Sequence, residues 1–247
     1  MKGQLITLEG IDGCGKTTVA TWLAQRLTNS RQYDECFPES LLKRSFVFTT
    51  EPTNGDAGRL LRTKMQRCED ASSKVSEETS PEMEQLEELF LFMADHADHL
   101  AKTVKPALKK GYVVISDRYS DSRVAYQGAT LRDVIPKSMD WIHDLHSPWS
   151  TTPDLTLFYS IDPTSAMGRC RFRWKNATSG STNGPEKFER VEFLREVDEN
   201  FRILTKKEPK RFVIIDANLD LEEVEEETLN VITKFLSDKK YSRKPIR

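Results

Sequence analysis

The chain has 247 residues, and its 37 lysines and arginines nearly balance its 39 aspartates and glutamates, which gives a formal net charge of -2. This balance argues against a dedicated nucleic-acid-binding protein, which usually carries a basic domain. An aromatic content of 9% and several apolar runs exclude wholesale disorder, and the runs are too short to cross a membrane. We therefore expect a folded protein that binds neither nucleic acid nor membranes.

Predicted strands and helices alternate along the chain. The expected strands are the short apolar runs Leu5–Leu8, Phe46–Thr50, Tyr112–Ile115, Leu155–Ile161 and Phe212–Ile215. The expected helices are the longer segments of helical period, Lys16–Thr28, Glu84–Lys109, Pro136–His146, Thr164–Arg173, Phe188–Lys207 and Leu221–Leu236. This order predicts an α/β fold with a parallel sheet covered on both faces. Ligands of such sheets bind beyond the carboxyl ends of the strands, so we expect the functional residues directly after them.

No composition shift along the chain indicates a domain linker, so we expect one domain over residues 1–238 and a basic tail over residues 239–247. Three segments have the composition of loops or insertions: Asn29–Ser45, Gln66–Gln85 and Trp174–Lys187. The four cysteines form neither a Cys-x-x-Cys pair nor a zinc-binding spacing, and the N-terminal residues do not resemble a secretory signal. These features predict a cytoplasmic protein with reduced thiols.

Residues 10–17 match the phosphate-binding pattern G-x-x-x-x-G-K-[ST] without a mismatch, between a predicted strand and a predicted helix. The backbone N–H groups of such a loop converge on phosphate oxygens, Lys16 supplies a positive charge, and the Thr17 hydroxyl suits a Mg²⁺ ligand. The alternative is a chance glycine-rich turn. The expected ATP-binding residues are Gly10, Ile11, Asp12, Gly13, Cys14, Gly15, Lys16, Thr17 and Thr18.

Two residues within this loop are unusual. The Asp12 carboxylate repels phosphate, so it either caps the following helix or points away, toward a hydroxyl of a second substrate. Cys14 is small enough to be a filler, although a helix N-terminus can make a thiol reactive.

A second cluster of polar residues follows the strand Tyr112–Ile115. Asp117 stands where a carboxylate near Mg²⁺ belongs, and the adjacent Arg118 can clamp a phosphate with two hydrogen bonds. The alternative is an ion pair between the two that closes the strand. The next polar residues supply a hydroxyl, a guanidinium, an aromatic ring and an amide. These groups suit recognition of a base and a sugar, and they belong to Ser122, Arg123, Tyr126 and Gln127.

Taken together, these motifs resemble those of thymidylate (dTMP) kinases. The matching segments are Leu8–Thr18, Phe48–Thr53, Leu89–His96, Lys105–Gly128, Pro153–Pro163 and Arg211–Ala217. The resemblance implies the P-loop nucleoside monophosphate kinase fold, with a five-stranded parallel sheet and a mobile lid. It also implies a homodimer that uses Mg²⁺ and transfers the ATP γ-phosphate to dTMP, giving dTDP and ADP. Two alternatives remain, a kinase for another nucleotide or deoxynucleoside and a nucleotide-binding scaffold with little turnover.

The resemblance also implies roles for residues of the acceptor site. Asp12 resembles the carboxylate that binds the 3′-hydroxyl, Arg118 the phosphate clamp, and Tyr126 the ring that excludes a 2′-hydroxyl. Phe92 resembles the ring that stacks on thymine, although it equally suits a helix core. The implied substrate-binding residues are Asp12, Glu51, Phe92, His96, Arg118, Ser122, Arg123, Tyr126 and Gln127, and the implied metal ligands are Thr17, Asp117 and Glu51.

The lid is expected over about residues 169–190, where several arginines precede a loop-like segment. Some relatives place an arginine inside the phosphate loop, but Gly13 and Cys14 occupy those positions here, so the chain resembles the type with lid arginines. The alternative is a solvated, basic helix end. The implied catalytic residues are Lys16, Arg118, Asp117, Arg169 and Arg173.

The sequence departs from the family pattern at two positions. Thr50 replaces the arginine of a T-R-E-P turn, a loss that Arg59 or Arg62 could cover. His96 replaces the arginine that usually bonds thymine O4. We expect Arg123 to take over that bond, with His96 as a weaker donor; the alternative is that Arg123 faces solvent or a partner subunit.

One further cluster, Asp95, His96 and His99, has the spacing of one helical turn. The two histidines have no further ligand at a spacing that is recognisable for metal sites. We therefore expect them to face substrate or solvent rather than to hold a metal ion.

Overall fold

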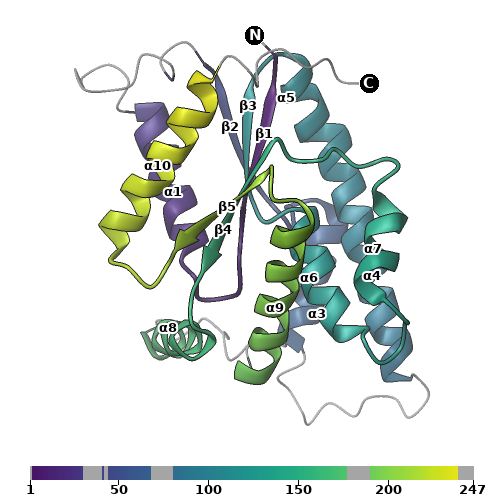
Figure 1. Cartoon of the computed structure of the whole chain (residues 1–247). Helices are drawn as coiled ribbons and strands as arrows, with labels where there is room; N and C mark the ends of the chain where they lie inside the picture. The colour runs from purple at the N-terminus through teal and green to yellow at the C-terminus, as the bar shows by residue number, and fades with distance from the viewer. Residues whose placement is uncertain (1, 30–40, 42–43, 68–79, 177–189, 239–247) are drawn as a thin grey trace.

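The computed structural model describes residues 2–29, 41, 44–67, 80–176 and 190–238. Its centre is a five-stranded parallel sheet in the order β2-β3-β1-β4-β5 (Figure 1). The strands are β1 (Gln4–Glu9), β2 (Phe46–Thr50), β3 (Val113–Asp117), β4 (Leu155–Ser160) and β5 (Phe212–Asp216). The expected α/β fold and all five strands are therefore confirmed, with their ends shifted by one or two residues.

Helices cover both faces of the sheet. Figure 1 shows α1 and α10 on one side and α4, α6, α7 and α9 on the other. The helices are α1 (Lys16–Asn29), α3 (Asp56–Arg67), α4 (Pro81–His99), α5 (Lys105–Lys109), α6 (Ser120–Thr130), α7 (Ser138–His146), α8 (Pro163–Asn176), α9 (Val191–Lys207) and α10 (Leu221–Ser237), with a π-helical turn η2 (Leu100–Val104) between α4 and α5. None of the helices in the described part of the chain is long and apolar enough to span a bilayer.

The sequence analysis missed two helices, α3 and α6. Helix α3 is short and rich in charged residues, although its few apolar residues gather on one face. Helix α6 has polar side chains on nearly every face, so its sequence carries little apolar periodicity. Yet nearly all of α6 is buried. Several of its polar residues face the candidate site, and Asp121 pairs with Arg211 beside the sheet, which explains why a helix with a polar sequence lies inside the protein.

The register of β3 with its two neighbours fixes where the motifs meet. Asp117, the last residue of β3, pairs with Leu8 of β1 and with Thr50 of β2. Beyond this point the Arg118 N–H donates to the Leu8 carbonyl at 3.0 Å, and the Glu51 N–H donates to the Asp117 carbonyl at 3.1 Å. The parallel pairing thus brings the ends of three strands, and the loops that follow them, to one edge of the sheet.

A buried ion pair anchors α6 to the sheet. The Arg211 guanidinium, which precedes β5, donates to both carboxylate oxygens of Asp121 in the first turn of α6, at 2.6 and 2.8 Å. Arg211 also binds Glu208 at 2.7 Å. The Arg211 and Asp121 side chains are only 12% and 6% exposed, so water cannot replace either partner fully.

We predict that Asp121→Ala destabilises the fold by about 3 kcal/mol, because it leaves a buried guanidinium short of its main acceptor. Asp140→Ala is the matched control, since it removes the exposed Asp140–Lys207 pair and is expected to cost less than about 1 kcal/mol. Urea denaturation of both variants measures the difference. Equal losses would show that Asp121 does not anchor α6.

Candidate active site

The phosphate loop connects β1 to α1, and glycine is required within it. Gly13 has φ 82°, and a Cβ at this position would lie 2.2 Å from the Ala166 carbonyl oxygen. Lys16 begins α1 and folds back over the loop, where its Nζ donates to the Ile11 carbonyl at 3.2 Å. Cys14 is buried in the core, which agrees with the interpretation of a small filler and leaves little access for a thiol reagent.

Thr17 and Asp117 together offer oxygen ligands beside the loop. The Thr17 hydroxyl donates to Asp117 Oδ2 at 2.6 Å. The other carboxylate oxygen, Asp117 Oδ1, is buried and has no hydrogen-bond partner in the described part of the chain. A hydroxyl and a carboxylate with a spare oxygen suit Mg²⁺, which prefers oxygen ligands and keeps several waters. These two residues therefore fit the expected metal site.

The Asp12 side chain points toward Arg118 and α6. One of its carboxylate oxygens is bound by the Arg118 guanidinium, and the other accepts from the Tyr126 hydroxyl at 2.9 Å. Burial opposes ionisation of Asp12, but the charges of Arg118 and Lys16 hold its pKa below the ordinary value. Of the two interpretations of Asp12, the geometry supports the one in which it faces a second substrate rather than capping α1.

Arg118 adopts a backbone conformation that side chains rarely occupy. Its φ is 65°, in the left-handed region, which stores strain at this position. The turn aims the guanidinium back across the sheet edge, where Nη1 lies 3.3 Å from the Gly10 carbonyl and 3.2 Å from the Ser122 hydroxyl. Arg118 therefore links the phosphate loop to α6 instead of closing the strand with Asp117.

A cavity lies between the phosphate loop, the turn after β2, α4 and α6. Every expected substrate-binding residue except His96 lines it. The sequence analysis missed four lining residues, Pro52, Met65 and Tyr119 together with Arg62, which it had considered only as a substitute charge. The cavity therefore lies directly beside the phosphate loop, next to Asp12 and Arg118.

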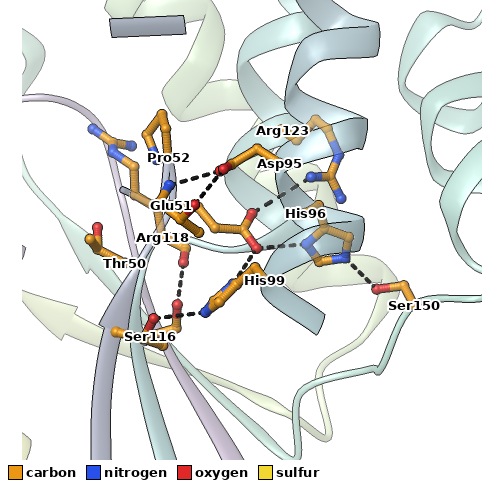
Figure 2. Close-up of polar contacts among 12 residues, drawn as sticks. Thr50, Glu51, Pro52, Asp95, His96, His99, Ser116, Arg118, Arg123 and Ser150 are labelled. Atoms are coloured by element: carbon orange, nitrogen blue, oxygen red, sulfur yellow. Dashed lines mark hydrogen bonds and ion pairs between the residues drawn. The ribbon is translucent and has the colours of Figure 1, made fainter. Parts of the chain in front are cut away.

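Glu51 also lines this cavity and binds two histidines of α4 (Figure 2). Its Oε1 is 2.6 Å from His96 Nδ1 and 2.8 Å from His99 Nδ1, and its Oε2 is 3.6 Å from Arg123. Burial alone would raise the pKa of Glu51, but His96, His99 and Arg123 together hold it well below its usual range. A carboxylate that is already surrounded by donors is poorly suited to bind metal, so the structure argues against the expected metal role of Glu51.

His96 is not among the residues that line this cavity, so its expected role as a substrate donor stays a prediction. It is fully buried, and its second ring nitrogen, Nε2, lies 2.8 Å from the Ser150 hydroxyl. Both of its nitrogens are therefore already bonded within the protein. Sequence spacing put His96 on the same helix as Phe92 but could not show that it faces Glu51.

The remaining candidates around the turn after β2 have separate roles. Arg62 lines the cavity and donates to the Thr53 carbonyl at 2.7 Å, whereas Arg59 lies on the surface beside Asp56. Arg62, and not Arg59, is therefore placed to supply the positive charge that the turn lacks because Thr50 replaces its arginine. Asp95 accepts from Thr53 at 2.6 and 2.8 Å, so it fixes this turn and points away from the histidines.

Helix α8 carries the two lid arginines of the expected catalytic set. Arg169 and Arg173 are both exposed, and the charge of Arg173 contributes to the low pKa of Asp12. This contribution is smaller than those of Arg118 and Lys16. Residues 177–189 of the expected lid and residues 239–247 of the expected tail lie outside the described residues.

A buried acid, Glu9, contacts the site through Ser122. Glu9 is the last residue of β1, and its carboxyl is hydrogen-bonded to the Ser122 hydroxyl, which in turn accepts from Arg118. Burial, with a smaller contribution from Asp121, raises the pKa of Glu9 to about 8. Glu9 is therefore mostly protonated at neutral pH.

We predict that the wild-type protein loses stability relative to Glu9→Gln as the pH rises from about 5 to about 8. An unfolded Glu9 releases its proton near the ordinary pKa, whereas the folded protein retains the proton up to the raised pKa. Over this window the folded state binds more protons, so its stability falls with rising pH. Glutamine keeps a hydrogen-bonding group for Ser122 without this titration. Parallel denaturation curves for the two proteins at pH 5, 6.5 and 8 test the prediction, which fails if their difference is constant.

Comparisons with known proteins agree with this geometry. The family described as "Thymidylate kinase" matches residues 8–228. A "Probable thymidylate kinase" of Methanosarcina mazei is 43% identical over 236 residues, which cover 96% of this chain and 98% of that protein. Another of Halobacterium salinarum is 42% identical over 221 residues, covering 90% and 91%.

A solved structure supports the same assignment. The crystal structure of thymidylate kinase from Ehrlichia chaffeensis matches with a TM-score of 0.62 and 25% identity, over 94% of this chain and 100% of that one. The sequence similarity extends over nearly the whole chain, and the fold is the same. The chain therefore belongs to the thymidylate kinase family.

Proposed function

We infer that the protein transfers the γ-phosphate of ATP to dTMP, giving dTDP and ADP. The observation that carries this inference is the link between two sites: Arg118 and Asp12 join the phosphate loop to the cavity lined by Phe92 and Tyr126. A kinase needs donor and acceptor phosphates at one place, and this link puts the two sites side by side. A scaffold without turnover would not need the second cavity.

The donor side is built by the phosphate loop and Lys16. The loop N–H groups and the N-terminus of α1 bind the ATP phosphates, and the Lys16 ammonium balances charge on the transferred group. Thr17 and Asp117 would hold Mg²⁺, which neutralises charge on the β- and γ-phosphates when it is bound. Arg173, on α8, adds positive charge, and we propose that it acts with Arg169 and a lid over about residues 169–190.

The acceptor side is built by α6 and the turns that face it. Arg118 is bound to Asp12, and the acceptor phosphate would compete for the same guanidinium donors. Asp12 would then accept from the 3′-hydroxyl of the sugar, with Tyr126 holding its other oxygen. Phe92 offers a ring against which a base can stack.

This chemistry needs no general base. The phosphate of dTMP has a second pKa of about 6, so its attacking oxygen is already ionised near neutral pH. The protein's part is therefore to bring the two phosphates together, balance their charge and exclude water. We further propose that the catalytic unit spans residues 1–238 and that the enzyme acts in the cytoplasm as a homodimer.

We predict that Lys16→Ala removes at least 99% of the dTMP-dependent ADP release, because charge on the transferred phosphoryl group is left unbalanced. Coupled ADP-release assays with and without dTMP measure this loss. Lys210→Ala, a change at an exposed surface lysine, is the matched control and should retain normal turnover. Near-normal turnover by Lys16→Ala would contradict the assignment. The same assay with dCMP, dGMP and thymidine as acceptors separates a thymidylate kinase from a kinase of another acceptor class.

We predict that Tyr126→Ala reduces the preference for dTMP over its ribose counterpart by about 1–3 kcal/mol, because a shorter side chain makes room for a 2′-hydroxyl. Tyr126→Phe is the control, since it removes only the hydroxyl bound to Asp12 and keeps the ring. The ratio of kcat/KM for the two acceptors measures the effect. If the ratio is unchanged in the alanine variant, Tyr126 serves only the core.

A further inference from the structure

The guanidinium of Arg118 is held along two edges by partners of different charge. On one edge, Nη1 donates to the Gly10 carbonyl at 3.3 Å and to the Ser122 hydroxyl at 3.2 Å. On the other edge, Nη2 donates to the Asp12 carboxylate. Only Asp12 is an anion, so it is the partner that a phosphate replaces in kind. The two edges can therefore respond differently when an acceptor phosphate arrives.

The Ser122 hydroxyl is the middle of a chain of hydrogen bonds. It accepts from Arg118 and donates its single proton to Glu9 Oε2. The bond to Glu9 therefore turns the lone pairs of the hydroxyl toward Arg118. Because Glu9 and Gly10 are consecutive, this end of β1 holds Nη1 twice, directly through the Gly10 carbonyl and indirectly through Ser122.

Glu9 directs Ser122 without carrying a charge of its own at neutral pH. Its side chain is fully buried. Burial, with a smaller contribution from Asp121, raises the pKa of Glu9 to about 8 against the opposing charges of Arg118 and Lys16. A neutral carboxyl still accepts a hydrogen bond, but it does not attract a guanidinium as a carboxylate does. Glu9 can thus orient the hydroxyl without competing with a phosphate for Arg118.

We propose that Glu9 is a positioning residue for the phosphate clamp Arg118 and acts through the Ser122 hydroxyl. This inference rests on the proposed function, in which the acceptor phosphate binds Arg118. The phosphate would take the Nη2 edge from Asp12, while Gly10 and Ser122 keep the Nη1 edge in place. The clamp would then exchange one partner without losing its direction, which limits the reorganisation that binding requires.

The first test separates the acceptor from the donor substrate. Ser122→Ala removes the middle of the chain, and Glu9→Leu removes its acceptor. Each variant should raise the KM for dTMP about 5- to 10-fold, the weight of one hydrogen bond. The KM for ATP should stay within about twofold of the wild type, whereas general damage to the phosphate loop beside Glu9 would raise it as well. Glu9→Gln keeps an acceptor for Ser122 and should restore the KM for dTMP.

The second test asks whether the loss depends on the acceptor phosphate. Calorimetric titration of Ser122→Ala should show weaker binding of dTMP than in the wild type, but unchanged binding of thymidine, which lacks the phosphate. Thr7→Val is the matched control, because it removes a buried hydroxyl of the same strand β1 that is bonded to Thr156 and not to the clamp. It should leave both affinities as they are.

The third test combines Glu9→Leu with Ser122→Ala. The double variant should lose no more dTMP affinity than the weaker of the two single variants, because both changes break one chain. Additive losses would overturn the proposal, as would equal losses for dTMP and thymidine, wild-type dTMP affinity in Ser122→Ala, or a glutamine variant as weak as Glu9→Leu. If Glu9→Leu does not fold, Ser122→Ala decides alone, since Glu9 has no other proposed route to Arg118. Failure of the wild-type protein to bind dTMP would instead refute the proposed function.

Discussion

The whole site depends on the parallel register of β3 between β1 and β2. Asp117, the last residue of β3, pairs with Leu8 of β1 and with Thr50 of β2. The three strands therefore end at the same edge of the sheet. The phosphate loop, the turn that carries Glu51 and the start of α6 then emerge side by side. A shift of this register by one residue would turn every side chain of a strand to the opposite face of the sheet, so no part of the site could form independently.

Two acid–arginine pairs divide the acceptor cavity. Asp12 pairs with Arg118 beside the phosphate loop, and Glu51 pairs with Arg123 beside α4. In each pair the acid comes from a turn after a strand, and the arginine comes from the segment between β3 and the middle of α6. Each pair keeps an arginine oriented before substrate arrives, so little reorganisation is needed on binding.

The sequence predicted most of the fold and the phosphate loop because both leave local signals. Strands buried on both faces are continuous apolar runs, and the loop has fixed glycine spacing. Helix α6 left no such signal, since its buried residues are polar. Its candidate residues were nonetheless found, first from the mixture of polar groups that follows a predicted strand and then from the family resemblance. Ser122, Arg123, Tyr126 and Gln127 all line the cavity.

The roles of Glu51 and His96 could not be predicted, because they depend on contacts between distant segments. The sequence places His96 one turn after Phe92, but only the packing of α4 against β2 shows that its ring faces Glu51 and Ser150. The same contacts occupy the Glu51 carboxylate and make it a poor metal ligand. Side-chain direction within a buried network is a tertiary property, and no residue spacing encodes it.

The most direct measurement is a crystal structure of the protein with dTMP and ADP bound. Our account predicts the dTMP phosphate against Arg118, the 3′-hydroxyl against Asp12, the base stacked on Phe92, and Arg123 within about 3 Å of O4. Binding of dTMP outside the cavity lined by Asp12, Phe92 and Arg118 would contradict the account.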